Sequence, residues 1–443
     1  MILAHLRALV TKFPLDITGR NMTKILRFIP LMILAILIPS FVEVDITLPG
    51  FPQMAKYFNA SVTEIQWTLI INFIGLCAFT LFYGPLSDSF GRKKILYFGC
   101  GLFCIASIGC LLVNNLFFLY ICRFLQGFGC SAIWVVGFVI ASDVYKKDDA
   151  VQVFGVLNAA ISASLTIAPM VGSFIAANFG WKATYLFVVI LSFSSVITVF
   201  FLPETNPSKK HLNIKTIAIE YGLLLSNRKY LVYALTPSLL VSGLIAYIST
   251  IPFLYLEQLH VPFVIFALYQ AIIGSCLAIV GSLSGKIYKK IGAPLSILLS
   301  IIICASGCLL LLVTSIIFPF SAISFTLSMS IICIGSSIQF SMVFAKSLDL
   351  FPQIRGSASS LITFMRLILF SISVTVVGKY YTGKLYDSAT VISGIILCGL
   401  ILSLYVRHDL KQNLVVDRKN VALKPPDAYS GQLEQGFRSE SEH

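Results

Sequence analysis

Charged residues are scarce in this chain. Lysine, arginine, aspartate and glutamate make up 12% of its 443 residues, whereas hydrophobic residues make up 57% and the mean hydropathy is +0.91. An average soluble domain carries roughly 25% charged residues. Because so few charges cannot cover the surface of a folded domain in water, the composition excludes a water-soluble globule.

The sequence also lacks the motifs of common enzymes. It contains no HExxH, no GxSxG and no GxxxxGK[ST] phosphate loop. The five histidines lie outside the long apolar runs, at His5, His211, His260, His408 and His443. We therefore expect no enzymatic activity, no cofactor and no use of ATP. A sensor or scaffold remains an alternative, although the charged residues that lie within the long apolar runs would then have no role.

Cysteine pairs typical of metal sites are absent. All eleven cysteines lie inside apolar runs and no CxxC occurs. Neither an extracellular disulfide framework nor a metal site is indicated, and we interpret the cysteines as small apolar side chains.

What the chain has instead is twelve long apolar runs. They cover residues 28–51, 66–83, 95–113, 116–140, 151–177, 183–202, 230–255, 262–285, 293–317, 321–345, 357–378 and 390–406. About twenty apolar residues in a helix cross a hydrocarbon core of about 30 Å. Each run is continuously apolar rather than alternating, which predicts helices and not the strands of a barrel. The expected fold class is an all-α polytopic membrane protein with twelve transmembrane helices in two six-helix bundles.

Basic residues are unevenly distributed among the connections. If the N-terminus is cytoplasmic, 26 of the 32 basic residues lie in cytoplasmic segments and two, Arg123 and Arg366, lie within spans. The four outside are Lys56, Lys182, Lys379 and Lys384. This bias predicts that both termini are cytoplasmic, so the net charge of +13 needs no nucleic-acid partner.

A polar connection divides the spans into two sets of six. Within it Ile214, Ile217, Tyr221 and Leu224 recur at helical spacing, which predicts a short amphipathic helix on the cytoplasmic surface. From Met22 onward the sequence reads as a complete N-terminus, with basic residues before an apolar run. We therefore expect residues 1–21 to be an optional extension. The expected parts are a cytoplasmic segment 1–27, a bundle 28–203, a linker 204–229, a second bundle 230–406 and a cytoplasmic tail 407–443 that we expect to be disordered.

Two polar stretches resemble one another. GPLSDSFGRKKI, residues 84–95, follows the second span, and GSLSGKIYKKIG, residues 281–292, follows the eighth; they align without gaps at an offset of 197. In this alignment Gly285 replaces Asp88 and Tyr288 replaces Gly91. We predict a tight cytoplasmic turn at each stretch, and the repeat indicates duplicated bundles related by an axis along the membrane normal.

These stretches and RFLQG in span four resemble the major facilitator superfamily. Further stretches resemble its bacterial twelve-span drug:proton antiporters of the Bcr/CflA type. They are VDITLP (44–49), RFLQGFG (123–129), SDVY (142–145), GWK (180–182) and LPETNP (202–207). The resemblance implies a multi-pass monomer of the inner (cytoplasmic) membrane that moves a small-molecule substrate by alternating access, with the proton gradient as its energy source.

The first polar stretch carries an acid that a simple turn does not need. We expect a conformational latch in which Asp88 faces the positive N-terminal end of span eleven, at residues 355–359, while Arg92 pairs with Asp143. The resemblance assigns this role to the corresponding acid and base. The expected latch residues are Gly84, Asp88, Gly91, Arg92 and Asp143. The alternative is a purely structural turn, in which glycine allows close passage of the backbones and the bases anchor the inner face.

Span one contains two acids, Glu43 and Asp45. A charge at mid-bilayer costs about 2.5 to 3.5 kcal/mol on insertion scales, so a buried one is expected to be functional. The two side chains point about 200° apart on a helix, so both are not expected to face one cavity. Asp45, in the stretch VDITLP, is the expected proton carrier, with Glu43 as its partner or replacement. The alternative is that either acid reaches interfacial water near the outer end of the span.

Proton coupling by a carboxylate rests on competition. A desolvated carboxylate favours its protonated form, takes a proton from outside and releases it when substrate binds nearby. The resemblance implies that Arg123 supports this coupling, with Gln126 as a nearby hydrogen-bond acceptor. A purely structural role for Arg123 is the alternative.

Span five and several scattered polar residues complete the predicted site. Ala168, Pro169 and Gly172 resemble an antiporter signature, and proline with small neighbours bends a membrane helix and allows close packing. The expected cavity residues are Trp134, Asn158, Tyr247, Tyr255, Gln270, Gln339 and Arg366. Arg366 departs from the neutral residue expected of the family, and it would bind an anionic substrate group or pair with Asp45 or Glu43.

The favoured function is multidrug efflux, the export of small amphipathic compounds in exchange for protons. The alternative is a proton-coupled importer of a small metabolite or nutrient on the same fold, for which Arg366 is the best support.

Overall fold

The computed structural model describes residues 22–144, 147–206 and 213–422, and every regular element in these ranges is helical. Eleven of the described helices are long and apolar enough to cross a membrane. A twelfth, α7 (Lys147–Phe179), has 33 residues, of which Thr166–Phe179 form a shorter apolar stretch in the searched part. The all-α membrane fold predicted from the apolar runs is therefore confirmed. Residues 1–21, at the start of the predicted N-terminal segment, lie outside the described ranges.

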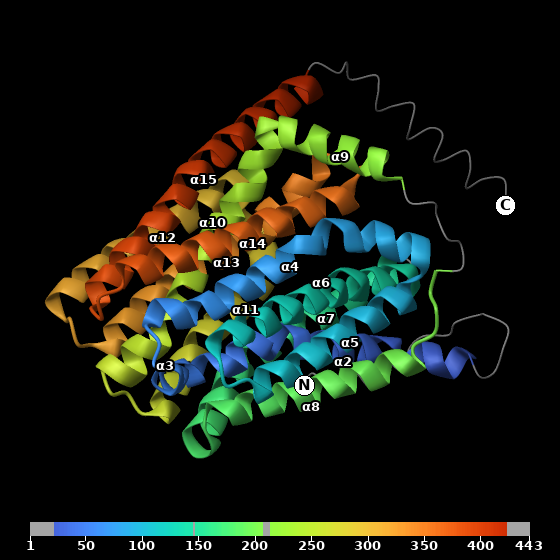
Figure 1. Cartoon of the computed structure of the whole chain (residues 1–443). Helices are drawn as coiled ribbons and strands as arrows, with labels where there is room; N and C mark the ends of the chain where they lie inside the picture. The colour runs from blue at the N-terminus through green and yellow to red at the C-terminus, as the bar shows by residue number, and fades with distance from the viewer. Residues whose placement is uncertain (1–21, 145–146, 207–212, 423–443) are drawn as a thin grey trace.

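The first set of helices forms one bundle, seen in blue to green in Figure 1. Its elements are α2 (Met22–Thr47), the 3-10 turn η1 (Leu48–Gly50), α3 (Phe51–Phe58), α4 (Val62–Phe90), α5 (Arg92–Leu112), α6 (Leu116–Val144), α7 and α8 (Trp181–Phe201). Helix α6 packs on α4 and α5, and α2 packs on α7 and α8. A capping box starts α4, since the backbone N–H of Glu64 donates to Ser61 Oγ and the backbone N–H of Ser61 donates to the Glu64 carboxylate.

The second set forms the other bundle, in yellow-green to red in Figure 1. Its elements are α10 (Arg228–Ile251), the π-helical turn η2 (Pro252–Gln258), α11 (Phe263–Ile291), α12 (Ala293–Ile317), α13 (Ala322–Asp349), α14 (Arg355–Tyr380) and α15 (Leu385–Ala422). The connection between the bundles contains α9 (Ile214–Ser226), which begins where Asn213 Oδ1 accepts from the N–H of Thr216. Residues 207–212 of the predicted linker are outside the described ranges.

The bundles meet along two pairs of helices, α4 with α14 and α7 with α11. At the end where α4 begins, Thr63 Oγ1 donates to the carbonyl oxygen of Gly378 at 3.1 Å, and Gln66 Nε2 donates to that of Ser249 at 3.1 Å. The rings of Phe51 and Phe253 also meet there, with centroids 6.2 Å apart. Hydrogen bonds and aromatic packing therefore join the halves at this end of the molecule.

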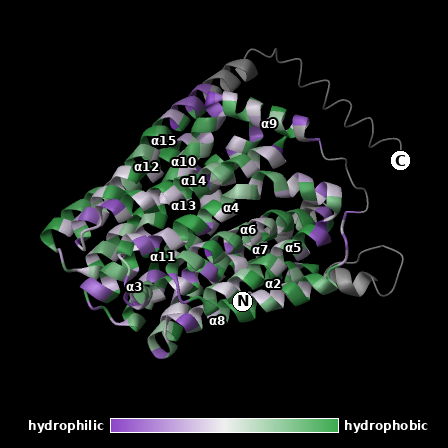
Figure 2. Cartoon of the chain, in the orientation of Figure 1, coloured by the Kyte–Doolittle hydropathy of each residue, from purple (hydrophilic) through white to green (hydrophobic). Residues whose placement is uncertain are grey.

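Hydrophobic residues dominate the helices of both bundles, as the green ribbons of Figure 2 show, and many of them face outward. Large hydrophobic side chains are strongly exposed there, including Ile105 at 68%, Phe174 at 65% and Phe179 at 70%. A soluble monomer rarely exposes so much contiguous apolar surface. This surface fits a hydrocarbon environment, and the chain is a multi-pass membrane protein.

The internal repeat has a different register from the one expected. Helices α4 and α11 both have 29 residues, and their first and last residues are 201 positions apart. Helices α5 and α12 begin 201 positions apart as well. The offset of 197 is therefore wrong by about one helical turn, because helix lengths and not the shared Gly, Leu and Ser letters set the correspondence. Gly91 corresponds to Gly292, and Asp88 corresponds to Lys289 rather than to Gly285.

The tight turns are also shorter than expected. Helix α4 continues to Phe90 and α5 starts at Arg92, so Gly91 alone makes the turn, with φ of 105°. Gly292 does the same between α11 and α12, with φ of 78°. Such positive φ values favour glycine. Most of the stretch 84–95 is therefore helical, and the predicted tight turn is confined to Gly91.

The predicted tail is partly ordered. Helix α15 runs to Ala422, so the expectation of disorder from residue 407 is wrong for 407–422, and residues 423–443 lie outside the described ranges. Val406 and Leu410 continue the apolar face and pack with Tyr233. The Asp409 carboxylate accepts from Tyr233 Oη at 2.7 Å and lies 2.8 Å from Lys229 Nζ. These contacts stabilise the first turn of α15 beyond Val406.

Candidate functional site

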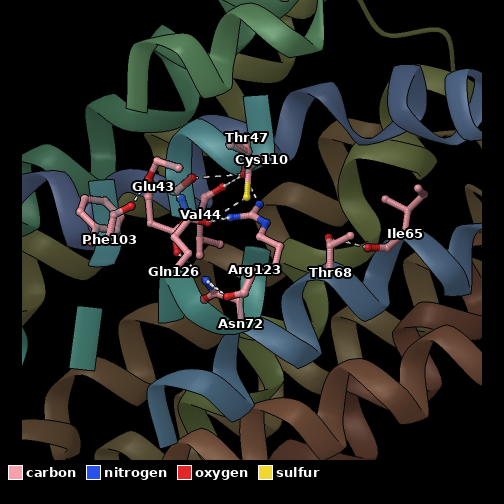
Figure 3. A network of polar contacts seen from close by, with 11 residues as sticks. Glu43, Val44, Thr47, Ile65, Thr68, Asn72, Phe103, Cys110, Arg123 and Gln126 are labelled. Atoms are coloured by element: carbon pink, nitrogen blue, oxygen red, sulfur yellow. Dashed lines mark hydrogen bonds and ion pairs between the residues drawn. The ribbon is translucent and has the colours of Figure 1, made fainter. Parts of the chain in front are cut away.

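A buried ion pair lies inside the first bundle. Arg123 Nη1 on α6 lies 2.6 Å from Glu43 Oε2 on α2, and both side chains are almost completely removed from solvent (Figure 3). The guanidinium carbon also lies 5.1 Å from the centre of the Tyr185 ring on α8. A buried charge of this kind persists only when paired and hydrogen-bonded, and here each charge has the other as its partner.

Polar side chains from neighbouring helices surround this pair. Asn72 Nδ2 on α4 donates to Glu43 Oε1 at 2.9 Å, and Arg123 Nη2 donates to Thr47 Oγ1 at 2.8 Å. Arg123 Nη1 donates to Gln126 Oε1 at 2.9 Å, as the sequence suggested. Gln126 Nε2 in turn donates to Ser107 Oγ on α5 at 2.9 Å. We call Glu43, Thr47, Asn72, Ser107, Arg123 and Gln126 the buried polar network.

Glycine brings the helices of the network together. An ideal Cβ on Gly127 of α6 would lie 2.1 Å from the carbonyl oxygen of Asn72, and one on Gly75 of α4 would lie 2.2 Å from that of Phe124. Side chains cannot fit at such a crossing, so small residues are needed there. The close approach lets Asn72 Nδ2 reach the backbone carbonyl oxygen of Arg123 at 3.3 Å. The stretch RFLQGFG therefore supplies both the charge and the close contact.

Asp45 lies in a different environment from Glu43. Its side chain is half-buried, and no residue in the described ranges makes a hydrogen bond or ion pair with its carboxylate. The helical angle between the two residues had predicted that they face different surroundings, and this is what is found. Glu43 does not reach interfacial water, because it is 1% exposed and paired with Arg123.

The turn around Gly91 gathers a second charged cluster. Arg92 Nε lies 2.9 Å from Asp143 Oδ2, and Arg92 also pairs with Asp88 one helical turn earlier. In the described part of the chain Asp88 makes no hydrogen bond or ion pair with the start of α14, although Asn206 Nδ2 donates to its backbone carbonyl. The pairing of Asp88 with α14 therefore stays a prediction.

Glu204 is an unanticipated member of this cluster. Its carboxylate accepts from the backbone N–H of Arg92 at 3.0 Å and of Lys93 at 3.2 Å, which caps the positive end of α5. A Cβ on Gly91 would lie 2.6 Å from Glu204 Oε2. Gly91 is thus favoured by its backbone angle, and a Cβ there would push this carboxylate aside. Gly84 makes no comparably close approach, since a Cβ there would meet only a methyl group of Val135 at 3.9 Å.

The signature of span five contacts span one. A Cβ on Gly172 of α7 would lie 2.2 Å from the carbonyl oxygen of Ile46, the residue after Asp45. Ala168 is buried and Pro169 lies inside the helix, where its carbonyl oxygen accepts from Ser173 Oγ at 2.6 Å. Helices α2 and α7 therefore cross in direct backbone contact beside the acid.

Several of the expected cavity residues are engaged in packing within the second bundle. Tyr255 Oη donates to the carbonyl oxygen of Ala322 at 2.8 Å, and Gln339 Nε2 donates to Ser403 Oγ at 3.0 Å. Tyr247 is fully buried and stacks on Phe325. These are contacts with helices of the same bundle. Their contact with substrate stays a prediction.

The remaining cavity residues differ in their surroundings. Trp134 on α6 stacks on Phe41 of α2, with ring centroids 4.4 Å apart. Gln270 on α11 is buried. Arg366 on α14 is half-buried, and its guanidinium lies 6.0 Å from the centre of the Phe340 ring. Neither Asp45 nor Glu43 pairs with Arg366 in this structure. The side chain of Asn158 lies outside the described residues.

The match to a family model decides which family this architecture represents. The model described as Major Facilitator Superfamily matches residues 33–374. The chain belongs to the Major Facilitator Superfamily. Members of this superfamily are transporters, so the protein is a membrane transporter with a small-molecule substrate.

Curated relatives within the superfamily cover most of the chain. The "Uncharacterized MFS-type transporter YdgK" of Bacillus subtilis is 31% identical over 354 residues, 78% of this chain and 86% of the relative. The "Multidrug resistance protein MdtL" of Escherichia coli is 28% identical over 320 residues, 72% and 80% of the two chains. The "Bicyclomycin resistance protein homolog" of Haemophilus influenzae is 26% identical over 358 residues, 80% and 89%.

Solved structures of other transporters share the fold. A D-xylose-proton symporter superposes with a TM-score of 0.68 at 15% identity, covering 84% of this chain and 96% of the symporter. A mutant form of the nucleoside transporter NupG gives 0.66 at 16% identity, covering 85% and 98%. At these identities the similarity concerns the fold alone.

Several members of the site were not predicted from the sequence. Asn72 and Ser107 are lone polar residues inside apolar spans, whereas Thr47 follows the two acids of span one, and that isolation was an available signal for Asn72 in particular. In the sequence Glu204 stands out only as part of LPETNP. Its role depends on the approach of residue 204 to residue 91, which the order of residues in the chain does not reveal.

Proposed function

We propose that this superfamily member is a proton-coupled exporter of small amphipathic compounds, a multidrug efflux antiporter that acts as a monomer in the inner membrane with both termini in the cytoplasm. The single observation that supports the coupling is the contrast between two acids on α2. Glu43 is held by Arg123, whereas the Asp45 carboxylate has no partner among the described residues. Relatives named for multidrug and bicyclomycin resistance favour export over import.

In this proposal Asp45 carries the proton. Its partner-free carboxylate is protonated from the outer side, and a cationic substrate group that arrives from the cytoplasm favours the ionised form and displaces the proton. The proton and the substrate then exclude one another from the same acid. The proton gradient is the only energy source, and no cofactor takes part.

Glu43 and Arg123 have a positioning role in this scheme. The pair neutralises the arginine and fixes α2 against α6 through Thr47 and Asn72. Asp45 is on the same helix, and the backbone contact of Ile46 with Gly172 links it to α7. Rocking of the two bundles at the α4–α14 and α7–α11 contacts would then change the access to Asp45.

Transport by everted membrane vesicles tests this function. Vesicles that contain the full chain, acidified inside, should accumulate ethidium, and nigericin should abolish the accumulation by collapsing the pH gradient. Asp45→Asn should abolish gradient-driven uptake while the amount of protein in the membrane is unchanged. Uptake by Asp45→Asn equal to the wild type would exclude Asp45 as the carrier. Proton-driven movement in the opposite direction would favour import.

We also propose the latch on the cytoplasmic side. Arg92 holds Asp143 in this structure, and Asp88 is 37% exposed on its side chain and close to the turn. When the bundles close at this end, Asp88 would leave Arg92 and cap the N-terminus of α14. Asp88→Asn should reduce the rate of ethidium uptake without reducing membrane insertion. Full transport by this variant would exclude the latch.

A further inference from the structure

Two arginines lie well inside the described spans, and their surroundings differ sharply. Arg123 is fully buried, pairs with Glu43 at 2.6 Å and donates to Thr47 and Gln126. Arg366 is half-buried, and no acceptor for its guanidinium occurs in the described part of the chain. The ring of Phe340 is near it, at 6.0 Å.

An arginine without an acceptor at membrane depth calls for an explanation. Such residues are costly to insert and face a cavity or a functional partner. An aromatic ring compensates part of the charge but leaves the donors of the guanidinium unused. The buried polar network shows how this fold satisfies an arginine with a structural role, and Arg366 has none of those contacts.

Arg366 lies on the part of α14 that joins the two bundles. Two residues before it, the carbonyl oxygen of Phe364 accepts from Cys77 Sγ of α4 at 3.7 Å. Four residues after it, the ring of Phe370 packs against Phe73 of α4, with centroids 5.6 Å apart. Phe340 reaches Arg366 from α13, which belongs to the second bundle. The guanidinium is therefore held near the junction across which an alternating-access transporter moves its substrate.

The geometry points to a recognition role: we propose that Arg366 binds an acidic group of the transported compound, and that the preferred substrates are amphipathic zwitterions. A planar guanidinium matches a carboxylate with two parallel hydrogen bonds. This proposal rests on the proposed function, because it assigns a substrate class to the same transport site.

A positive group on the substrate follows from the exchange with protons. An ionised Asp45 repels a simple anion, so an anion would bind together with the proton rather than displace it. A compound that carries both an acid and an amine satisfies both residues. The amine displaces the proton from Asp45, and the acid is held by Arg366.

A matched pair of dyes tests the proposal on the purified full chain. One is a diaminoxanthene rhodamine with a free benzoate, and the other is the methyl ester of the same dye, which keeps the cationic ring system and lacks the acid. Fluorescence anisotropy gives the dissociation constant of each. We expect the wild type to bind the free acid at least about tenfold more tightly than the ester, as one charge-assisted hydrogen-bond pair provides.

Variants separate recognition from general damage. Arg366→Gln should remove the preference for the free acid and leave ester binding within about twofold, and Arg366→Lys should keep part of the preference because a point charge lacks the planar fork. Lys379→Gln removes one exposed charge from the same helix and should change the dissociation constant of neither dye. Equal affinity for the two dyes in the wild type, no binding of the free acid, or equal weakening of both dyes by Arg366→Gln would overturn the proposal.

Uptake of the two dyes by vesicles tests the proposed function separately from the binding preference. Ester uptake by acidified everted vesicles does not require Arg366 to bind an acid. Ester uptake without a binding preference for the free acid would support proton-driven export and contradict the proposed role of Arg366. A clear preference for the acid without gradient-driven movement of either dye would support Arg366 and remove proton-coupled export.

Discussion

Tyr221 of the linker helix and Leu81 of the first bundle are joined by a hydrogen bond. Tyr221 Oη on α9 donates to the carbonyl oxygen of Leu81 on α4 at 2.9 Å. The preceding residue, Glu220, accepts from Ser357 Oγ at the start of α14. Leu224 of the same helix is fully buried against the second bundle. Helix α9 therefore contacts both bundles beside the α4–α14 contact.

Tyr221→Phe should loosen α9 without unfolding the protein. The variant keeps the ring and loses one hydrogen bond, worth about 0.5 to 1.5 kcal/mol, so backbone amides of residues 214–226 should exchange with deuterium roughly two- to tenfold faster. Burial raises the pKa of the hydroxyl to about 12 from 10.0, so the bond is fully present below pH 10 and lost only as pH rises through about 12. Tyr97→Phe, at an exposed position, is the control, and unchanged exchange over α9 would contradict the role of the bond.

Glu43→Gln should destabilise the first bundle. It leaves Arg123 buried without its counter-ion, and removing one partner of a buried pair costs about 3 to 5 kcal/mol. Thermal unfolding of the purified protein, followed by tryptophan fluorescence, should therefore begin at a lower temperature. The double variant Glu43→Gln with Arg123→Gln removes both charges and should recover part of the loss. If the double variant were less stable than Glu43→Gln alone, the ion pair would not be the cause.

Gly172→Ala should separate α7 from α2 and impair transport. The added Cβ would lie 2.2 Å from the carbonyl oxygen of Ile46, which is backbone and cannot move aside as a side chain can. Overpacking of this kind destabilises a packed core by about 1 to 3 kcal/mol. Ethidium uptake by vesicles should therefore fall severalfold or more. Gly101→Ala meets no atom within 4 Å and serves as the control. Equal uptake by both variants would show that the crossing tolerates expansion.

Gly91→Ala and Gly180→Ala form a matched pair. Both residues have positive φ, 105° and 81°, so both variants strain the backbone. Only the Cβ at position 91 also displaces Glu204 from the start of α5, which adds the loss of a cap worth about 0.5 to 2 kcal/mol. The midpoint of thermal unfolding should therefore fall further for Gly91→Ala. Equal shifts would mean that Glu204 contributes no stability.

The helical elements could be predicted from the sequence because the length of a hydrophobic run is a local property. The apolar runs, the helix within the linker and the separation of Glu43 from Asp45 on α2 all follow from residue spacing along one helix. The predicted offset of the repeat was wrong because it, too, was based on local residue identities. Shared Gly, Leu and Ser residues favoured 197, whereas the equal lengths of α4 and α11, which only the folded helices reveal, give 201.

The prediction of disorder after residue 406 failed because composition does not record distant partners. The polar residues after Val406 look like a solvated tail, yet Asp409 meets Lys229 and Tyr233, which are far away in the sequence. A hydrogen bond or ion pair between separate helices can stabilise a segment whose own composition favours disorder.

The sequence by itself determined that this chain forms membrane-spanning helices and that acids and bases lie at membrane depth, because the cost of placing polar groups in hydrocarbon leaves a direct mark on composition. Only the tertiary structure decided which charges neutralise one another. Arg123 meets Glu43 because glycines bring α4 and α6 into contact and α2 presents Glu43 to α6, whereas Asp45 and Arg366 have no hydrogen-bond or ion-pair partner among the residues that the structure describes. Pairing depends on how helices cross, and that geometry is a property of the packed bundle rather than of any one span.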